Sequence, residues 1–518
     1  MDTKALRQKV LDLAIRGKLV PQDPNDEPAS VLLERIRQQK KQMVRDGKLK
    51  PKDIKNDTII FVGEDNLHYE KFADGSVKCI EDEIPFDLPE GWEWERLSNL
   101  AYFSGGKTPS TSHGEYWDGD TLWVTSKDMK SKYITSSQLR LSSLGAEQMQ
   151  MYPPNTLLLV TRSGILRHTL PVAILKECAT INQDLKAIVL YMPQLVEYIY
   201  MCLKGMETQL LLKYTKSGTT VENVNFDEFQ KVLLPIPPVE QINKIVSSTG
   251  RAECVVTTIE DNKTALADYV VKAKSKILDF AIRGQLVPQD PNDEPASVLL
   301  ERIRTEKEKL IRQGRIKRDK KESVIFRGED NSYYFDIPDG WALCPLKELF
   351  NVCSAKRVRQ SDWRTEGVPF YRAREIVKLS DNGFVDNDLF ISEEHYIRVK
   401  AECGVPEPGD LMVSGVGTIG KVYVVNSDDR FYYKDASVLC FENRTGVIDS
   451  QFARYMLESE FMQAQMKDNS KGTTVDTITI SAAMEYVCVL PPLAEQKRIV
   501  SAIETAFVHL KSISDALT

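Results

Sequence analysis

Two short segments have the glycine spacing of phosphate-binding loops. Ala101–Thr108 ends in Gly-Gly-Lys-Thr, which fits a permissive P-loop pattern, and Gly415–Gly420 fits Gly-x-Gly-x-x-Gly. A P-loop needs a strand before it and a helix N-terminus after it, because the N–H groups of the helix bind the phosphate. Pro109 follows the first segment, and the strand-like run that starts at Lys421 follows the second. The sequence therefore disfavours nucleotide binding at the first segment and predicts a tight hairpin turn at the second.

Motifs of catalytic centres are missing from both halves of the chain. The sequence contains no HExxH, no Gly-x-Ser-x-Gly and no Asn-Pro-Pro-Phe/Tyr or Asp-Pro-Pro-Tyr of the kind that adenine methylases use. The nine cysteines show neither a CxxC pair nor Cys/His spacing for a metal, which indicates a reducing compartment. We therefore expect no catalytic, cofactor-binding or metal-binding residue in this chain.

Polar and basic side chains gather instead in two stretches, residues 87–238 and 336–492. Arginine can donate two hydrogen bonds to guanine, and aspartate or glutamate can accept one from cytosine. Serine and threonine suit contacts with phosphates. For each residue the alternative is an ordinary solvated surface position. The candidate DNA-binding residues are Lys107, Thr108, Ser126, Lys127, Asp128, Lys130, Arg162, Ser163, Arg167, Lys216, Thr219, Thr220, Lys356, Arg357, Arg372, Arg374, Glu375, Ser414, Lys471, Thr473 and Thr474.

The overall composition is that of an ordinary globular protein. The chain has 518 residues, of which 42% are hydrophobic and 28% charged, and its net charge is −7. The negative charge disfavours indiscriminate binding to nucleic acid, because phosphates are neutralised by Lys and Arg, but it is compatible with local basic patches. No apolar run is long enough to span a membrane, and the charged N-terminal segment lacks the core of a signal peptide.

The chain contains a long internal repeat. Residues 9–37 and 276–304 differ at only three of 29 positions. Looser echoes follow in the same order, namely Leu88–Trp92 with Ile337–Trp341, a Gly-Thr-Thr-Val in each half, and Pro-Pro followed by Glu-Gln in each half. Nearly identical helix-rich blocks therefore alternate with two variable blocks. Two copies are too few for a solenoid, so we expect a pseudo-twofold object with one docking mode and two different readouts.

A coiled-coil pattern runs through the middle of the chain. Apolar residues with 4-3 spacing continue from Ile242 to Phe280 over about five heptads, which corresponds to a helix of roughly 60 Å. Gly284 and Pro288 end it. The two termini carry the same spacing, and joined end to end they would rebuild the central helix with a gap of about three residues. We infer that they jointly form the second helix of an antiparallel pair; the alternative is two unrelated amphipathic helices.

The variable blocks mix strand-like and helical segments. We expect strands at 121–124, 156–161, 170–175, 368–371, 410–414 and 421–425, and helices at 195–205 and 452–461. Shorter helices are expected at 29–43 and, in the copy, at 296–311, each with a proline near its start. Residues 50–85 and 315–335 are predicted to be polar connectors.

These features, in this order, resemble the specificity subunit of type I restriction-modification systems. They are the two Pro-Pro and Glu-Gln helix starts, the Leu-Pro-x-Gly-Trp-like segments, the Gly-Thr-Thr landmarks and the duplicated blocks, and they cover essentially the whole chain. The resemblance implies an α+β fold class, with two globular α+β target-recognition domains separated by a long antiparallel helical coiled coil, pseudo-twofold and cyclic. Some relatives begin with a recognition domain, whereas this chain begins with a helix, which is a circular permutation of the same cycle.

The resemblance also implies the function. The chain would be a non-catalytic, sequence-specific DNA-binding subunit that reads a bipartite target and directs DNA adenine methylation and restriction by partner subunits. The partners would be double-stranded DNA, two methylation subunits and, in the full complex, two restriction subunits, with no membrane. The chain would need no cofactor of its own, while the partners would use S-adenosylmethionine, ATP and Mg²⁺. We expect a cytoplasmic, nucleoid-associated location, and the helices would fix the gap between half-sites.

The expected domains follow the repeat. They are an N-terminal repeated helical region (1–50), a connector (51–86), target-recognition domain 1 (87–238), a central repeated coiled-coil region (239–314), a connector (315–335), target-recognition domain 2 (336–492) and a C-terminal helix that pairs with the N-terminus (493–518). Two alternatives remain open at this point. One is a coiled-coil adaptor without DNA specificity, and the other is a nucleotide-driven enzyme that uses the Ala101–Thr108 loop.

Overall fold

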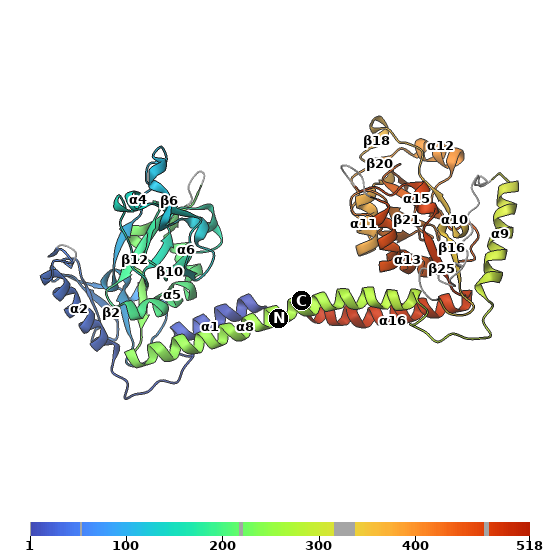
Figure 1. Cartoon of the computed structure of the whole chain (residues 1–518). Helices are drawn as coiled ribbons and strands as arrows, with labels where there is room; N and C mark the ends of the chain where they lie inside the picture. The colour runs from blue at the N-terminus through green and yellow to red at the C-terminus, as the bar shows by residue number, and fades with distance from the viewer. Residues whose placement is uncertain (1, 52–53, 217–220, 315–336, 471–475, 518) are drawn as a thin grey trace. The chain divides into compact units, whose positions relative to one another are not determined.

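The computed structural model describes residues 2–51, 54–216, 221–314, 337–470 and 476–517. The chain divides into two compact units, Met1–Asn262 and Lys263–Thr518 (Figure 1). Each unit combines a domain of strands and short helices with longer framework helices. The predicted α+β class is therefore confirmed, and each unit is described in turn.

The framework helices begin and end close to the predicted positions. In the first unit α1 spans Thr3–Ile15, and α2 spans Ala29–Arg45 directly after Pro28. In the second unit α9 spans Ala296–Arg312 and α16 spans Leu493–Leu517. The predicted helices at 29–43 and 296–311 are thus confirmed as α2 and α9.

A 44-residue helix, α8, extends over Val239–Ile282. In the first unit α1 packs on it, since Arg7 pairs with Glu260 at 2.7 Å and donates to the Thr257 hydroxyl at 2.9 Å. In the second unit α16 packs on it, since the Lys274 ammonium lies 5.6 Å from the centre of the Phe507 ring. The heptad pattern is thus used in both units. The predicted meeting of the two termini concerns both units together and stays a prediction.

Two positions of the heptad pattern are wrong. Val256 and Val270 are buried as expected, but Leu266 and Phe280, placed on the other row of the seam, are exposed. Leu278, Ala281 and Ile282 are buried in place of Phe280, in a cluster that includes Ile303 of α9. The last turns of α8 therefore face the core of the second unit, and the buried face rotates away from the coiled-coil row.

The recognition domain of the first unit is built on a five-stranded sheet in the order β5-β12-β9-β10-β7. Its strands are β5 (Ala101–Gly105), β7 (Tyr133–Ile134), β9 (Leu157–Val160), β10 (Val172–Leu175) and β12 (Leu185–Leu190). Beside it lies a sheet of β6 (Trp117–Val124), β8 (Leu139–Leu141) and β11 (Ala179–Ile181), and two-stranded pairs are formed by β4 (Glu93–Arg96) with β15 (Leu233–Ile236) and by β13 (Thr215–Lys216) with β14 (Asn223–Val224). The helices are α3 (Leu97–Leu100), α4 (Ser143–Glu147), α5 (Val196–Gly205), α6 (Glu207–Tyr214) and α7 (Phe226–Phe229).

The second unit repeats this topology with different residues. The order β17-β24-β21-β22 corresponds to β5-β12-β9-β10, and the parallel pair of β19 with β23 corresponds to that of β6 with β11. The strands are β16 (Ala342–Pro345), β17 (Asn351–Cys353), β18 (Trp363–Arg364), β19 (Val368–Tyr371), β20 (Phe390–Ile391), β21 (Leu411–Ser414), β22 (Val422–Val424), β23 (Tyr432–Tyr433), β24 (Val438–Glu442) and β25 (Val487–Leu490). The helices are α10 (Leu346–Leu349), α11 (Ala373–Asn382), α12 (Glu393–Cys403), α13 (Ser450–Glu458), α14 (Glu460–Asp468) and α15 (Ile480–Met484).

Two predicted features of the second unit have clear outcomes. The Gly-x-Gly-x-x-Gly segment joins the antiparallel strands β21 and β22, and Gly417 and Gly420 both have φ of 76°, so the predicted turn is confirmed. The predicted helix at 452–461 is instead two helices, because Ser459 is extended and its side chain accepts a hydrogen bond from the Met462 amide. A serine at that position caps the new helix and so favours the break.

A junction between framework and recognition domain is built twice from the repeated residues. In the first unit the Trp92 indole N–H donates to the amide oxygens of Gln22 at 2.9 Å and Gln241 at 3.2 Å. In the second unit the Trp341 indole N–H donates to Glu495 at 2.9 Å. The echoed sequence landmarks therefore meet in space and hold the start of a long helix against its domain.

The same junction explains the glycine in each repeated block. Gly17 has φ of 65° and Gly284 has φ of 68°, a region that other residues rarely adopt. A side chain at either position would also overlap the ring of a proline, Pro89 in the first unit and Pro338 in the second. Both copies therefore need glycine where the framework chain turns against its domain.

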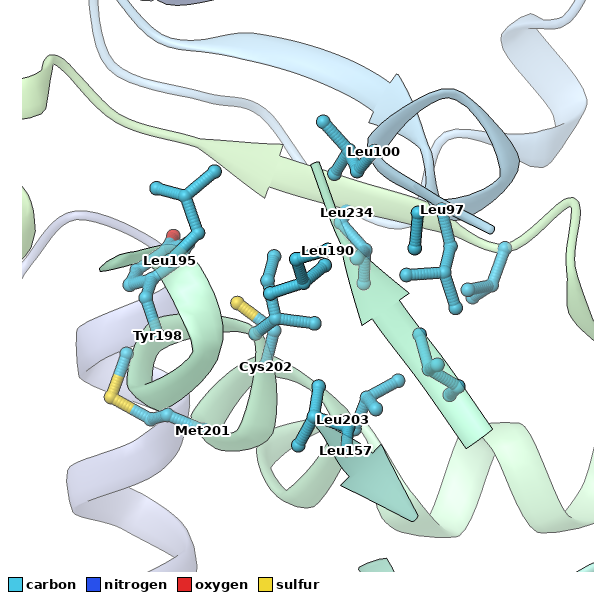
Figure 2. Close-up of a cluster of buried hydrophobic side chains, with 14 of the residues drawn as sticks. Leu97, Leu100, Leu157, Leu190, Leu195, Tyr198, Met201, Cys202, Leu203 and Leu234 are labelled. Atoms are coloured by element: carbon cyan, nitrogen blue, oxygen red, sulfur yellow. The ribbon is translucent and has the colours of Figure 1, made fainter. Parts of the chain in front are cut away.

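Apolar residues of the first recognition domain form a closed core. Leu97, Leu157, Leu203 and Leu234 come from α3, β9, α5 and β15 and converge in it (Figure 2). Cys202 lies among them, and burial raises the pKa of its thiol to about 12. This thiol is therefore protonated at neutral pH and acts as a small apolar side chain.

Residues 51–86, predicted to be a polar connector, contain a three-stranded antiparallel sheet. It consists of β1 (Ile59–Val62), β2 (His68–Lys71) and β3 (Val77–Cys79). Ile60 turns inward and packs in a cluster with Ile80, Trp94 and Leu233. β1 reads Ile-Ile-Phe-Val and is apolar, but β2 and β3 are short and together bury only one residue, so the segment as a whole lacks the pattern of a buried sheet.

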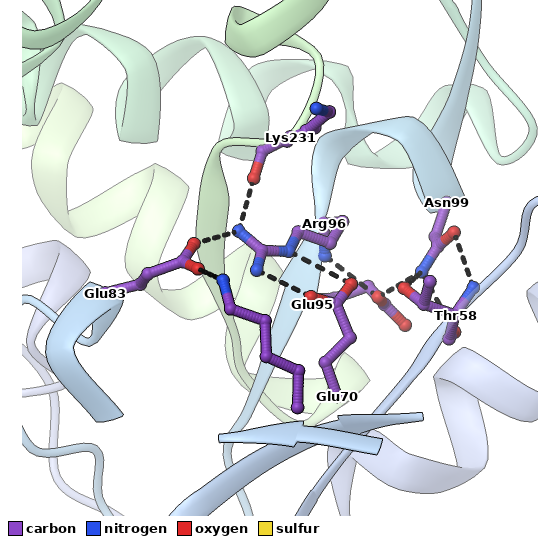
Figure 3. A network of polar contacts seen from close by, with 8 residues as sticks. Thr58, Glu70, Glu83, Glu95, Arg96, Asn99 and Lys231 are labelled. Carbon is purple, nitrogen blue, oxygen red and sulfur yellow. Dashed lines mark hydrogen bonds and ion pairs between the residues drawn. The ribbon is translucent and has the colours of Figure 1, made fainter. Parts of the chain in front are cut away.

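Buried charges attach this sheet to the recognition domain (Figure 3). The Arg96 guanidinium, which is 6% exposed, pairs with Glu70 at 2.7 Å and Glu83 at 2.9 Å and donates to the Lys231 carbonyl oxygen at 2.7 Å. Nearby, burial raises the pKa of Glu95 to about 7, although Asn99 donates to its carboxylate. The network replaces the hydration of each charge with protein partners.

Candidate nucleic-acid interface

The loop after β5 is fixed against the segment between β11 and β12. The Lys107 amide donates to the Ile181 carbonyl oxygen at 3.0 Å, and the Thr108 hydroxyl donates to the Gln183 side chain. Gly106 lies so close to the carbonyls of this segment that a side chain would overlap them. The loop therefore has a defined backbone while the Lys107 and Thr108 side chains stay exposed.

The same loop resembled a P-loop in sequence, but its surroundings differ from one. β5 precedes it, as a P-loop requires, yet residues 106–113 are not helical. The N-terminus of a helix that would bind a phosphate is therefore not present after Thr108. This geometry agrees with the sequence-based expectation and disfavours the nucleotide-driven enzyme.

The chain after β9 meets β14 at the same edge of the sheet. Arg162 lies opposite Asn223 in an isolated antiparallel bridge, and the Ser163 amide donates to the Glu222 carbonyl oxygen at 3.2 Å. Lys216 lies opposite Asn223 on the neighbouring strand. Arg162 and Lys216 are thus brought together from segments about fifty residues apart, and both are exposed.

A third loop, residues 125–130, borders this surface. It begins after β6, whose Val124 carbonyl oxygen accepts from the Asn182 amide at 3.0 Å. Asp128 organises the loop, because its carboxylate accepts from the Thr125 and Gln138 amides, each at 2.8 Å. Lys127 and Lys130 are exposed. Among the predicted residues here, Asp128 thus stabilises the backbone of the loop, and the two lysines face solvent.

Together these segments form what we call the first basic surface, defined by Lys107, Lys127, Arg162, Ser163 and Lys216. Arg167 stands next to it and pairs with Glu222, which removes part of its charge from the surface. The remaining cations and hydroxyls are at loop ends of a rigid sheet, an arrangement that suits contacts with phosphates and base edges.

The second recognition domain presents a shallow hollow of about 380 Å³ lined by Arg372, Arg374, Thr418 and Lys434. Lys434 reaches this place because its amide donates to the Tyr371 carbonyl oxygen at 2.8 Å, next to the parallel pair of β19 with β23. The hollow thus collects three cationic side chains from separate parts of the sequence. We call it the second basic surface.

Two carboxylates hold its arginines in place. Asp388 pairs with both Arg372 and Arg374 at 2.7 Å, and the buried Glu375 also pairs with both. Burial alone would raise the pKa of Glu375, but hydrogen bonds from the two arginines outweigh it and the pKa is lowered. The carboxylate is therefore ionised near neutral pH and fixes both guanidinium planes, leaving Arg374 half exposed to the hollow.

The other residues predicted in this domain have different environments. Lys356 pairs with Glu402, and Arg357, highly exposed, pairs with Asp435 at 3.1 Å. Ser414 is fully buried. Its hydroxyl donates to the Thr418 carbonyl oxygen at 2.6 Å and accepts from the Lys421 amide at 3.0 Å.

Two predicted contacts therefore need correction. Ser414 supports the turn between β21 and β22, and Glu375 is 1% exposed beneath the arginines, so neither offers its side chain to DNA. Five further predicted residues lie outside the described residues, namely Thr219, Thr220, Lys471, Thr473 and Thr474.

Lys434 and Asp388 are site residues that the sequence did not indicate. Both stand in loops without a motif, and they join the arginines only through the pairing of strands from distant segments. Lys434 could have been identified by recognising that β19 and β23 pair in parallel, because it directly follows β23. We know of no local signal that would have found Asp388.

The two domains use one backbone frame for different side chains. The bridge of Arg162 with Asn223 in the first domain corresponds in topology to the bridge of Val416 with Thr477 in the second. An arginine at this position in one domain is thus a valine in the other, whose cations come from α11 and the loop after β23. Equivalent frames with unlike surfaces are expected of two readers of different sequences.

Replacing Arg374 by alanine should relax base discrimination at one position of the DNA target. A bidentate contact of arginine with guanine contributes about 1–3 kcal/mol of discrimination. Arg374 would make this contact by exchanging Asp388 for the base, and the variant would lose it. Binding assays with single-base variants of the target measure the effect. Lys309→Ala, an exposed residue of α9 outside the repeated block, is the matched control and should leave discrimination intact. An equal loss of affinity for every DNA sequence would contradict a base contact.

Neither a metal centre nor a membrane segment is found in the described part of the chain. No group of three or more His, Cys, Asp or Glu residues among the described positions is arranged to hold a metal ion. Among those positions no helix has both the length and the apolar character to cross a membrane.

Comparison with known proteins identifies the family. A model of the type I restriction modification DNA specificity domain matches residues 89–253 and 338–512, which is one match in each half of the chain. The chain belongs to this family. Its function is sequence-specific DNA recognition as a specificity subunit, and catalysis lies in methylase and restriction partners.

Relatives in the specificity family extend over nearly the whole chain. The EcoAI specificity subunit of Escherichia coli is 25% identical over 97% of this chain and 88% of its own length. The EcoEI specificity subunit of the same species is 24% identical over 97% and 89%. A solved chain from work on complex assembly and conformational transition of the type I R-M system has a TM-score of 0.52 at 15% identity, covering 84% of this chain and 94% of that one, which shows a shared fold.

Proposed function

We propose that this specificity subunit reads a bipartite DNA sequence, one half with each recognition domain, and so directs adenine methylation and restriction by its partners. The observation that carries the proposal is the repeated topology with unlike basic surfaces. A protein that recognises one continuous DNA site would not need two domains of the same topology. Two readers of different half-sites would need equal attachment and different side chains, which is the pattern described above.

We further propose two methylation subunits and, in the full complex, two restriction subunits. Support comes from solvent-exposed residues that are the same in both repeated blocks. Val31 and Val298 are 37% and 42% exposed, and the ion pair of Arg35 with Glu27 is repeated by Arg302 with Glu294. Exposed residues that stabilise nothing have no structural reason to match, whereas identical partners that dock twice supply one.

The gap between half-sites follows from helix length in this proposal. α8 has 44 residues, which corresponds to about 66 Å at 1.5 Å per residue. Its two ends belong to different units. The first end is held by the hydrogen bond of Trp92 with Gln241, and the last turns pack in the core cluster that includes Trp341. A helix held in this way would set the number of unread base pairs between the half-sites.

The chemistry of modification and cleavage would come from the partners. S-adenosylmethionine would supply the methyl group in the methylation subunits, and ATP with Mg²⁺ would serve the restriction subunits. The chain itself would act in the cytoplasm, in association with the nucleoid. It would contribute DNA contacts and placement of the partners.

A gel-shift experiment on the complex with its methylation subunit tests the proposal. Methylome sequencing of the host first gives the target, and probes then carry both half-sites, one scrambled half-site, or a spacer changed by one base pair. We expect tight binding only to the intact probe, in a complex whose mass corresponds to two methylation subunits. Equal binding to a probe with one scrambled half-site would refute the bipartite reading, and indifference to spacer length would refute the role of α8.

A further inference from the structure

Two pairs of cysteines face each other across strands in the second unit. Cys344 lies opposite Cys488 in the pair of β16 with β25, and Cys353 lies opposite Cys440 in the pair of β17 with β24. Directly opposite residues of antiparallel strands have Cα atoms about 4.5–5.5 Å apart and side chains on one face. Disulfides form over about 4.4–6.8 Å, so both pairs are within reach of a bridge.

The surroundings of the two pairs differ. Cys344 and Cys488 are 1% and 0% exposed within the apolar core, and burial raises the pKa of both thiols. Cys353 is partly exposed and, together with Cys440 and Cys403, lines a cavity of about 140 Å³. An oxidant of small size can therefore meet one pair but not the other.

Polar groups surround the accessible pair. Cys353 Sγ lies 3.8 Å from the Tyr433 hydroxyl, and Cys440 Sγ lies 4.0 Å from a carboxylate oxygen of Asp410. Interaction with the neighbouring Cys353 thiol, followed by burial, raises the pKa of Cys440. Cys440 is thus kept protonated, and the more exposed Cys353 is the sulfur that an oxidant reaches first.

We propose that Cys353 and Cys440 form a site of reversible oxidation by hydroperoxides, closing as a disulfide inside the second recognition domain. The Cys353 sulfur attacks the terminal oxygen of the peroxide, the O–O bond breaks, and a sulfenic acid and an alcohol or water form. The Cys440 sulfur then attacks the Cys353 sulfur, and the S–OH group leaves as water with the Cys440 proton. The two thiols together lose two electrons and two protons to one peroxide.

Closure of this disulfide acts next to two residues that the sequence predicts to contact DNA. Cys353 is the last residue of β17, and the chain continues to Lys356 and Arg357. The Lys356 amide donates to the Tyr432 hydroxyl at 2.9 Å, and Tyr432 lines the same cavity. Drawing Cys353 towards Cys440 would shift this segment. We therefore propose, resting on the DNA-reading function above, that oxidation weakens reading by the second domain alone.

Peptide mapping of the full chain tests the site itself. The folded chain is treated with hydrogen peroxide, free thiols are blocked, and disulfides are identified by mass spectrometry. We expect a bridge between Cys353 and Cys440 that dithiothreitol reverses, while Cys344 and Cys488 stay reduced as the internal control. In Cys440→Ser, dimedone should label Cys353 as a sulfenic acid, and Cys403→Ser should leave the bridge unchanged. Equal oxidation of both pairs, or a bridge from Cys353 to Cys403, would overturn the assignment.

A DNA-binding assay tests the effect of the disulfide on DNA reading separately from its formation. Probes carry the full target or a target whose second half-site is scrambled. Oxidised wild-type chain should lose most of its discrimination between them and regain it with dithiothreitol, whereas Cys440→Ser should keep it throughout. A disulfide without loss of discrimination would overturn the regulatory part. Failure of untreated chain to discriminate would count against the proposed DNA reading and leave the thiol mapping standing.

Discussion

Exchange of residues 87–238 for the matching segment of a relative should change one half of the recognised DNA sequence and leave the other half as it was. The segment carries the first basic surface, including Arg162 and Lys216, but its borders make the repeated junction at Trp92. Each mismatched base pair costs about 1–3 kcal/mol, so the old half-site should be lost almost completely. Methylome sequencing of cells that carry the chimaera reads the result directly.

The reciprocal exchange provides the matched control. A chimaera with a new segment at 336–492 should change the other half-site and preserve the first, because the exchange leaves the first recognition domain and its junction at Trp92 untouched. Unchanged methylation after either exchange would support the coiled-coil adaptor and contradict DNA reading by these domains. Loss of all methylation with the chain still folded and in complex would also count against independent readers.

Replacing Arg96 by methionine should destabilise the first unit by about 3–5 kcal/mol, the usual cost of removing one partner from a buried ion network. Glu70 and Glu83 would lose the guanidinium that they share, and Glu70 is 5% exposed, so water cannot replace it. Urea unfolding followed by tryptophan fluorescence measures the change through Trp94, which packs beside this sheet.

Two further variants sharpen this result. Arg35→Met removes a comparable ion pair, with Glu27, from an exposed helix face and should cost about 0–1 kcal/mol. Arg96→Met combined with Glu70→Gln should recover part of the loss, since one unpaired buried charge is gone. Equal effects of Arg96→Met and Arg35→Met would show that the network contributes little to stability.

The framework could be predicted from the sequence because its contacts are repeated along with its residues. Identical blocks must fold alike, so the helices at 29–43 and 296–311 and the long central helix followed from local pattern. The sheet within 51–86 was not predicted, because β2 and β3 are short and together bury one residue, although the apolar run Ile59–Val62 of β1 is a strand signal. Phe280 was misplaced because packing on a domain core overrides the heptad at the end of α8.

The candidate site could be predicted only in part. Arg372 and Arg374 stand out as neighbours on the chain, but Lys434 and Asp388 reach them through tertiary pairing that no local pattern encodes. Ser414 looked like a phosphate ligand by residue type, yet a hydroxyl at the end of a buried strand is used by its own turn. Residue type indicates which chemistry is available, and burial decides which side chains can offer it to DNA.

The duplicated junction has an evolutionary consequence. Because residues 9–37 and 276–304 are nearly interchangeable, genetic crossover between the two blocks would splice α1 directly onto the second half of the chain without breaking a helix or a core. The product would retain one complete junction and one reader, and a homodimer of it would carry two identical readers suited to a palindromic target. Duplication of such an ancestor, followed by divergence of the inserts alone, would in turn account for the present asymmetric pair.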